Sequence, residues 1–193
     1  MCGRYYIPPE DDDAGFQALL EHLSSAYHAS PLAAQMKRGE ILPTDIAPVL
    51  TDGDAALMTW GFPRFDGKGV LINARLETAA EKPMFKKAYG AQRCLVPAAH
   101  YFEWQKDGVK KQKFALGTGD MIYMAGLYRF EQGQLLPSFV ILTRPAAPDI
   151  SFIHDRMPII LPEPFRKHWL SEPMDAAALL EASEENISYK AVV

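Results

Sequence analysis

The spacing of apolar residues predicts helices near both ends of the chain. Acidic residues 11–13 precede apolar side chains that recur three and four positions apart, as on one face of an amphipathic helix: Phe16, Leu19, Leu20, Leu23 and Tyr27. The three carboxylates suit the positive end of that helix dipole. Similar spacing predicts helices at Glu163–Leu170 and Met174–Ala182. Between these regions, Thr78–Gln92 is interrupted by Pro83 and predicts one or two short helices.

Short apolar runs separated by turn sequences predict a series of strands. Ile46–Leu50 and Ala55–Trp60 form a pair around the turn at residues 51–54, and Val70–Asn73 forms a further strand. A meander follows, with strands at Cys94–Pro97, Tyr101–Gln105, Lys113–Leu116, Met121–Phe130 and Ser138–Thr143, and a last strand lies near Ile187–Val192. Sequential strands with helices at both ends predict an α+β fold with a mainly antiparallel, barrel-like sheet. The length of 193 residues fits one domain over residues 1–193.

Charge and composition exclude several classes of protein. The chain has 20 Lys and Arg against 24 Asp and Glu, which argues against a non-specific polyelectrolyte binder but allows a local groove with a few arginines. Its apolar runs are too short for a membrane span, and its first residues lack a signal-peptide core, so we expect a cytoplasmic protein without a membrane partner. No Cys or His pair has metal-ligand spacing, and no glycine-rich phosphate loop follows a strand. We therefore expect neither a metal nor a cofactor.

Cys2 is the first residue with distinctive chemistry. Removal of Met1 would leave an amine and a thiol on adjacent carbons. An α-amine has a pKa near ~7.7 and a free thiol near ~8.5, so both are partly reactive at neutral pH. An aldehyde can form an imine with the amine, and the thiol can then close a five-membered thiazolidine. A single cysteine is a weak motif, so its presence by chance remains an alternative. We interpret Cys94, within an apolar run, as a buried strand residue.

Three further segments carry candidate site residues. In a strand, Asn73, Arg75 and Glu77 would share one face, which is either a solvent-facing surface or the wall of a site. Glu103 lies between aromatic residues, where desolvation favours a proton-bearing carboxyl suited to acid–base catalysis; the alternative is a solvent-facing glutamate. His154 has a side chain that titrates in the useful range, although a lone histidine is more often structural. Asp155 is interpreted as a local turn or cap partner.

Together these segments resemble the SOS response-associated peptidase (SRAP) family, which processes abasic sites. The matching pieces occur in the family's order: residues 1–5, Trp60-Gly61, residues 73–78, residues 93–97, Phe102-Glu103-Trp104 and residues 153–158. The resemblance implies twisted antiparallel strands around a barrel-like core. It implies that Cys2 forms a thiazolidine with the C1′ aldehyde of a ring-opened abasic deoxyribose, and that the family removes residues preceding this cysteine from itself.

The resemblance also implies roles for the other residues. Asn73 would orient the Cys2 amine, Glu103 would shuttle protons during ring opening and crosslink reversal, and His154 would stabilise the sugar oxygen and the imine. Three arginines would line the phosphate track, and one of two tryptophans would stack on a base: Arg4, Arg75 and Arg156, with Trp60 or Trp104. The expected partner is single-stranded DNA that contains abasic sites.

Two other functions stay open at this point. An N-terminal-nucleophile hydrolase would use the Cys2 thiolate against an amide, with its own amine as base, and would require oxyanion donors. A non-catalytic module could bind single strands through arginines and aromatics, which would leave Asn73, Glu103 and His154 without a role. Covalent capture uses all four candidate residues, and we therefore rank it first.

Overall fold

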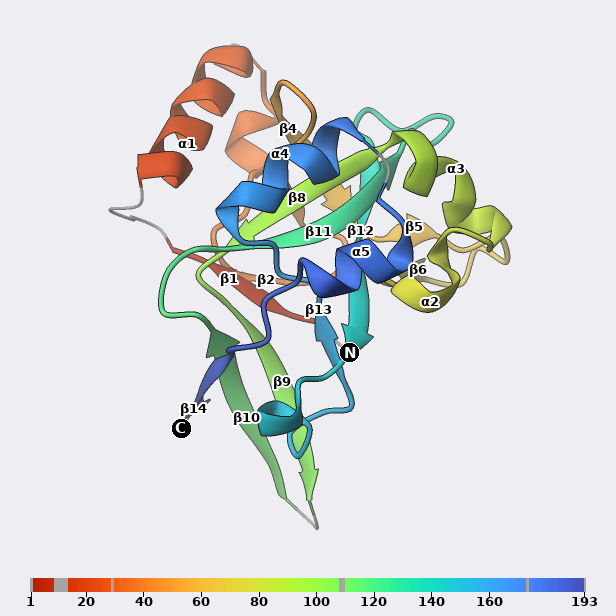
Figure 1. Ribbon diagram of the computed structural model, residues 1–193. Helices are drawn as coiled ribbons and strands as arrows, with labels where there is room; N and C mark the ends of the chain where they lie inside the picture. Colours follow the sequence, from red (N-terminus) through yellow and green to blue (C-terminus); the bar gives the residue numbers. More distant parts are fainter. Residues whose placement is uncertain (1, 9–13, 29, 108–109, 173, 193) are drawn as a thin grey trace.

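The computed structural model describes residues 2–8, 14–28, 30–107, 110–172 and 174–192. Helices flank a set of sheets, as Figure 1 shows, and the predicted α+β class is confirmed. The helices are α1 (Ala14–Ala26), α2 (Leu76–Ala79), α3 (Pro83–Ala91), α4 (Glu163–Ser171) and α5 (Ala176–Glu181), with short 3-10 helices at Ala33–Gln35 and Pro148–Ile150. Pro83 begins α3 at the position where a missing backbone N–H costs nothing, so it separates α2 from α3.

Five strands close into a barrel. They are β3 (Ile46–Leu50), β4 (Ala55–Trp60), β8 (Arg93–Ala98), β11 (Ile122–Arg129) and β12 (Ser138–Pro145). Their order is β11-β8-β3-β4-β12, and β11 pairs with β12 as well, which completes the ring. The predicted barrel-like core is therefore confirmed. Two strands extend the sheet along β12: β7 (Asn73–Arg75) and β13 (Arg156–Pro158). The pairings of β12 with β4 and with β7 are parallel, and the other pairings of the described strands are antiparallel.

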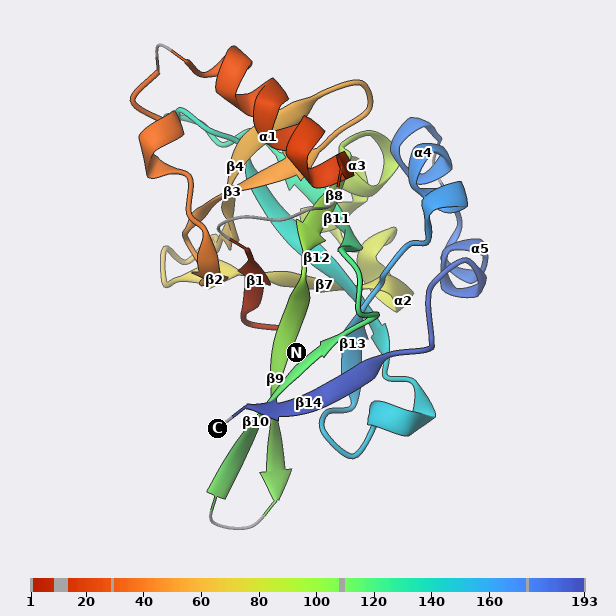
Figure 2. The same cartoon turned by 90° about the vertical axis from the view of Figure 1, so that its left-hand side faces the viewer.

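The core fills the barrel and the space beneath the helices. All six residues of β8 are buried, because β3 and β11 flank it and α3 and α4 pack against it. A Cβ atom at Gly126 would lie 2.9 Å from Sγ of Cys94, so only glycine allows β11 to approach β8 here. Cys94 is thus a buried strand residue, as predicted. Helix α1 covers β3 and β4 (Figure 2).

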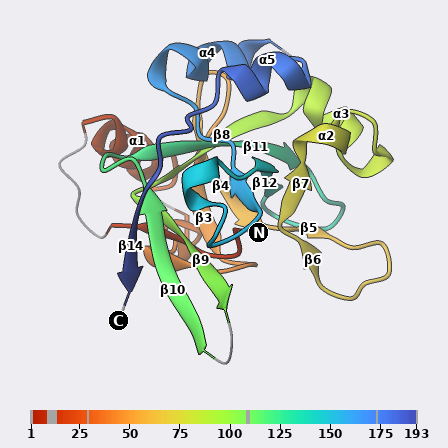
Figure 3. The same ribbon diagram turned by 60° about the horizontal axis from the view of Figure 1, so that its bottom comes forward.

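A second sheet positions the start of the chain. Its order is β14-β10-β9-β1-β2, with bounds Ser188–Val192, Lys110–Gly117, His100–Asp107, Tyr5–Ile7 and Gly39–Ile41. Strand β9 follows β8 after Ala99, so one run of chain passes from the barrel into this sheet. The β9–β10 hairpin projects away from the barrel, and β5 (Phe62–Pro63) and β6 (Val70–Leu71) form a separate ribbon (Figure 3).

Most predicted elements occur where the sequence placed them, and two expectations need correction. The predicted strand Val70–Asn73 is divided between β6 and β7. Glu77 does not continue the alternation of Asn73 and Arg75, because the strand ends at Arg75 and Glu77 lies in α2. Residues 11–13 lie outside the described residues. Within the described chain, no helix combines the length and the apolar character that crossing a membrane requires.

Candidate functional site

Cys2 lies three positions before Tyr5, the first residue of β1, and is fully buried. Its Sγ atom is 3.8 Å from the carbonyl oxygen of Arg4, a weak thiol hydrogen bond. Burial raises the pKa of this thiol far above its ordinary value, and the nearby charge of Glu103 raises the pKa further. In this environment the thiol keeps its proton at neutral pH, so it acts as a thiol until a partner removes that proton.

Asn73 connects Cys2 to the barrel. It begins β7, which runs parallel to β12 with Asn73 opposite Ile141. Its Nδ2 atom donates a hydrogen bond to the carbonyl oxygen of Cys2 at 2.8 Å. Its Oδ1 atom is buried and accepts no hydrogen bond from the described residues. The amide thus fixes the backbone of Cys2 and leaves one acceptor available, which fits the role predicted for it toward the Cys2 amine.

Glu103 and two tyrosines surround the thiol. Glu103 is buried in β9, next to β1 in the sheet, and interacts electrostatically with Cys2. Burial raises the pKa of the hydroxyls of Tyr5 and Tyr101, and the negative charge that Cys2 carries once it is ionised adds to both shifts. Sequence reasoning missed these tyrosines. Tyr101 could have been found, because it lies two positions from Glu103 and therefore on the same face of the strand.

A polar pocket of about 540 Å³ opens beside Asn73. Its walls come from β6, β7 and the segment that leads into β13: Val70, Leu71, Ile72, Asn73, Arg75, His154, Asp155 and Arg156. Asn73 both lines this pocket and bonds to the carbonyl oxygen of Cys2, so it joins the pocket to the backbone of Cys2. The structure therefore brings together Cys2, Asn73 and Glu103, and connects His154 to them through the pocket.

His154 has two neighbours at one ring nitrogen. Its Nδ1 accepts a hydrogen bond from the backbone N–H of Arg156 at 3.0 Å and lies 2.8 Å from a carboxylate oxygen of Asp155. One nitrogen cannot accept from the amide and donate to the carboxylate at once. We assign the amide bond, because the largely exposed Asp155 is well solvated without the imidazole. With that bond at Nδ1, the ring proton of a singly protonated imidazole lies on Nε2.

The three predicted phosphate contacts differ in their availability. Arg75 is exposed and lines the pocket. Arg156 is only 9% exposed; its guanidinium donates to both carboxylate oxygens of Glu77, at 2.5 and 2.9 Å, and to the carbonyl of Thr143. Arg4 donates to Glu40 at 2.7 Å. Of the three arginines, Arg75 therefore has the most accessible cation, and it lies at the pocket.

The two candidate stacking residues have opposite environments. Trp60 is 0% exposed; its Nε1 donates to the carbonyl of Ile72, and its ring packs against Tyr5 and Phe139. A base therefore has no access to Trp60, and its predicted DNA contact is corrected to a role in the core. Trp104 is half-buried on β9, and cations lie 5.2 and 5.7 Å from its ring centre.

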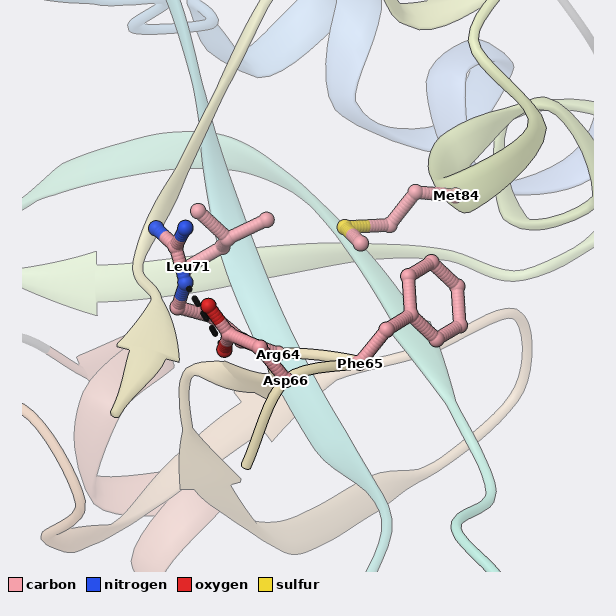
Figure 4. A pocket seen from close by; sticks show the side chains of 5 residues that line it. All are labelled: Arg64, Phe65, Asp66, Leu71 and Met84. Carbon is pink, nitrogen blue, oxygen red and sulfur yellow. Dashed lines mark hydrogen bonds and ion pairs between the residues drawn. The ribbon is translucent and has the colours of Figure 1, made fainter. Parts of the chain in front are cut away.

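A second pocket lies next to the first but lacks the candidate catalytic residues. It measures about 230 Å³ and is lined by Arg64, Phe65, Asp66, Leu71 and Met84 (Figure 4). Its lining is largely apolar, and Arg64 pairs with Asp66 at its edge. Within the described residues, no group of three or more His, Cys, Asp or Glu could hold a metal ion.

The fold and site define a class of α+β protein in which a buried cysteine at residue 2 is joined through an asparagine to a polar pocket. The SOS response associated peptidase (SRAP) family model matches residues 1–193, and the chain belongs to that family. It is 33% identical to the abasic site processing protein YedK of Escherichia coli over 95% of this chain and 84% of that one. It is 36% identical to YoaM of Bacillus subtilis, also an abasic site processing protein. That match covers 89% of this chain and 79% of YoaM.

Solved structures share this fold. A protein from Bacteroides thetaiotaomicron superposes with a TM-score of 0.81 at 21% identity. The superposition covers all of this chain and 92% of that protein. A phage-related protein from Bordetella bronchiseptica gives a TM-score of 0.72 at 25% identity. The superposition covers 99% of this chain and 94% of that protein. These likenesses support the arrangement of the barrel and the second sheet.

Proposed function

We propose that this protein handles abasic DNA by capturing the sugar aldehyde covalently at Cys2, after Met1 has been removed. The observation that carries the proposal is the hydrogen bond between the backbone of Cys2 and Asn73, a residue that also lines the pocket where Arg75 and His154 lie. The relatives named above are abasic site processing proteins, which supports the same class of substrate. The expected partner is a single strand, because the aldehyde must enter the site from an extended backbone.

The capture reaction balances without an oxidant or reductant. The Cys2 amine adds to the C1′ aldehyde, and the carbonyl oxygen leaves as water, which forms the imine. The sulfur then bonds to the imine carbon while the thiol proton passes to the imine nitrogen. Because burial keeps the thiol protonated, this last transfer needs a relay, and the buried carboxylate of Glu103 is suited to it.

The remaining residues would position the sugar. His154, with its proton on Nε2, would donate to the sugar oxygen as the ring opens and closes. Arg75 would pair with a flanking phosphate, and Trp104 would offer an aromatic surface to a neighbouring base. Reversal of the same steps, with water adding to the imine, would release the sugar aldehyde and restore the Cys2 amine and thiol. Removal of Met1, by an aminopeptidase or by the protein's own peptidase activity, is the precondition.

The decisive experiment mixes the purified protein with a labelled single strand that carries one abasic site. Mass spectrometry first establishes that the mature chain begins at Cys2. We expect a heat-stable adduct of one protein per strand, its loss in Cys2→Ser, and its retention in Cys94→Ser, which changes the other buried thiol. Durable crosslinking by Cys2→Ser would refute the thiazolidine.

Two further arms separate chemistry from binding. Glu103→Gln and His154→Ala should slow adduct formation or reversal while binding to intact single strands persists. Duplex DNA with the same abasic site should react poorly. Equal yields from duplex and single strand would refute the extended-strand model.

A further inference from the structure

Two cations share one carboxylate on the outer side of the second sheet. Nη1 of Arg4 donates to Oε2 of Glu40 at 2.7 Å, and Nζ of Lys113 donates to Oε1 of the same carboxylate. Both cations lie over Trp104, at 5.2 and 5.7 Å from its ring centre, and Lys113 lies 3.8 Å from the centre of Phe102. We call Arg4, Glu40, Lys113 and Trp104 the Glu40 cluster.

Strand register builds this cluster. Glu40 on β2 lies opposite Tyr6 on β1, and Lys113 on β10 lies opposite Trp104 on β9. Because β1 lies between β2 and β9, four adjacent strands bring residues from distant parts of the sequence to one face. Arg4 precedes β1, and its carbonyl accepts from the backbone of Phe102 at 2.8 Å and from the Cys2 thiol. The cluster is therefore anchored two residues from the thiol.

The charges of the Glu40 cluster do not cancel. Two cations face one carboxylate, so the cluster carries a net positive charge. The hydrogen bond from Lys113 lowers the pKa of Glu40, which keeps it ionised. The side chains of Arg4 and Glu40 are 34% and 37% exposed, and that of Lys113 is 20% exposed. Ion pairs this open to solvent contribute only about 0–1 kcal/mol to stability, so a competing anion can displace one.

A DNA phosphate presents the same kind of oxygen acceptors as a carboxylate and forms strong charge-assisted hydrogen bonds with Arg and Lys. Phe102 and Trp104 hold the two cations over their faces, which keeps both donors on the same side of the sheet. We propose that Lys113 joins Arg4, which the resemblance already assigns to the phosphate track, in a subsite for a backbone phosphate, and that Glu40 occupies this subsite until a strand displaces it. The identity of the ligand rests on the function proposed above.

The inference has a distinct consequence for affinity. Glu40 competes with the strand, so it weakens binding and reduces the number of counterions released. Removing its charge should have the opposite effect from removing the charge of Lys113. A purely structural ion pair would not produce opposite changes in DNA affinity. Loss of either partner would then leave the affinity unchanged or lower it.

The test measures reversible binding of a short oligothymidylate without an aldehyde, by fluorescence anisotropy over a series of salt concentrations. We expect Glu40→Gln to bind several-fold tighter at low salt and to steepen the slope of log affinity against log salt by up to ~0.7. Lys113→Gln should bind several-fold weaker with a shallower slope, and Lys113→Arg should stay near wild type. The double variant Glu40→Gln/Lys113→Gln should return toward wild-type affinity, since Arg4 alone then supplies one net charge.

Glu21→Gln is the matched control. It makes the same change in net charge on the exposed surface of α1, which packs on the barrel. Thermal unfolding checks that each variant is folded. Tighter binding in Glu40→Gln but not in Glu21→Gln supports the subsite; equal or weaker binding in folded Glu40→Gln overturns it. Covalent adduct formation is measured separately, so capture can fail while the subsite stands, or the reverse.

Discussion

The side chain of Asn73 holds the backbone of Cys2 across 71 positions of sequence, through a hydrogen bond of 2.8 Å from Nδ2 to the Cys2 carbonyl oxygen. Asn73 is fixed in turn by the parallel pairing of β7 with β12. The position of the thiol is thereby tied to the closed barrel rather than to the first strand alone. The same hydrogen bond links the backbone of the buried cysteine to a residue that lines the exposed pocket.

Asn73→Asp should impair both stability and capture. The change keeps the shape of the side chain but replaces the Nδ2 donor with an oxygen that faces the Cys2 carbonyl. A buried carbonyl left without its donor costs about 1–3 kcal/mol of unfolding free energy, and the rate of adduct formation should fall with it. Urea unfolding and single-turnover crosslinking measure the two effects. Asn186→Asp, the same change at an exposed position, should alter neither; wild-type behaviour of Asn73→Asp would show that the hydrogen bond has no role.

The protein should lose stability in alkali. Burial raises the pKa of the thiols of Cys2 and Cys94 above the ordinary value of ~8.5. Above about pH 8.5 the unfolded chain releases these protons while the folded chain keeps them, so the stabilisation present below that pH declines as pH rises. Each such thiol lowers the unfolding free energy by about 1.4 kcal/mol per pH unit there. Urea unfolding at neutral and alkaline pH should show this decline, and Cys94→Ala should flatten it; an unchanged slope in Cys94→Ala would contradict the assignment.

Arg75 should contribute more to DNA affinity than Arg156. Arg75→Gln should weaken single-strand binding. The slope of log affinity against log salt should become shallower by about 0.7, the value for one phosphate contact. The pair variant Glu77→Gln/Arg156→Gln leaves the net charge unchanged and removes a bidentate ion pair whose charges already cancel. It should keep the wild-type salt slope and lose only about 0.5–1.5 kcal/mol of stability, because the side chain of Glu77 is 46% exposed and neither partner is left unpaired. A shallower slope in the pair variant would instead assign Arg156 to the phosphate track.

The two tryptophans should separate folding from binding. Trp60→Ala removes a fully buried ring from the core and should cost about 3–5 kcal/mol of unfolding free energy. Trp104→Ala should leave the fold largely intact and weaken single-strand binding by about 1–3 kcal/mol, the usual contribution of one stacked base. Calorimetry and anisotropy give the two readouts. Loss of DNA affinity without loss of stability in Trp60→Ala would show that its ring reaches DNA after all.

The sequence alone determined the class of fold and most of the elements. Strands Ile46–Leu50 and Ala55–Trp60 were predicted with the bounds that the structure gives to β3 and β4. Short apolar runs and turn residues act locally, so they can be read from neighbouring positions. The three-residue strands β1, β2 and β13 were missed, because three residues carry too little periodicity to be recognised.

For the site, too, some features could be predicted from the sequence and others only from the tertiary structure. Residue type and order were enough to select Cys2, Asn73, Glu103 and His154, since the chemistry of an aminothiol, an amide, a carboxylate and an imidazole belongs to each residue. Tertiary structure alone decided that Trp60 is buried, that Arg156 is bound to Glu77, and that Glu40 lies between two cations. Burial and ion pairing arise between strands that meet only when the barrel closes and the second sheet forms. They depend on contacts across long stretches of sequence, which no local pattern records.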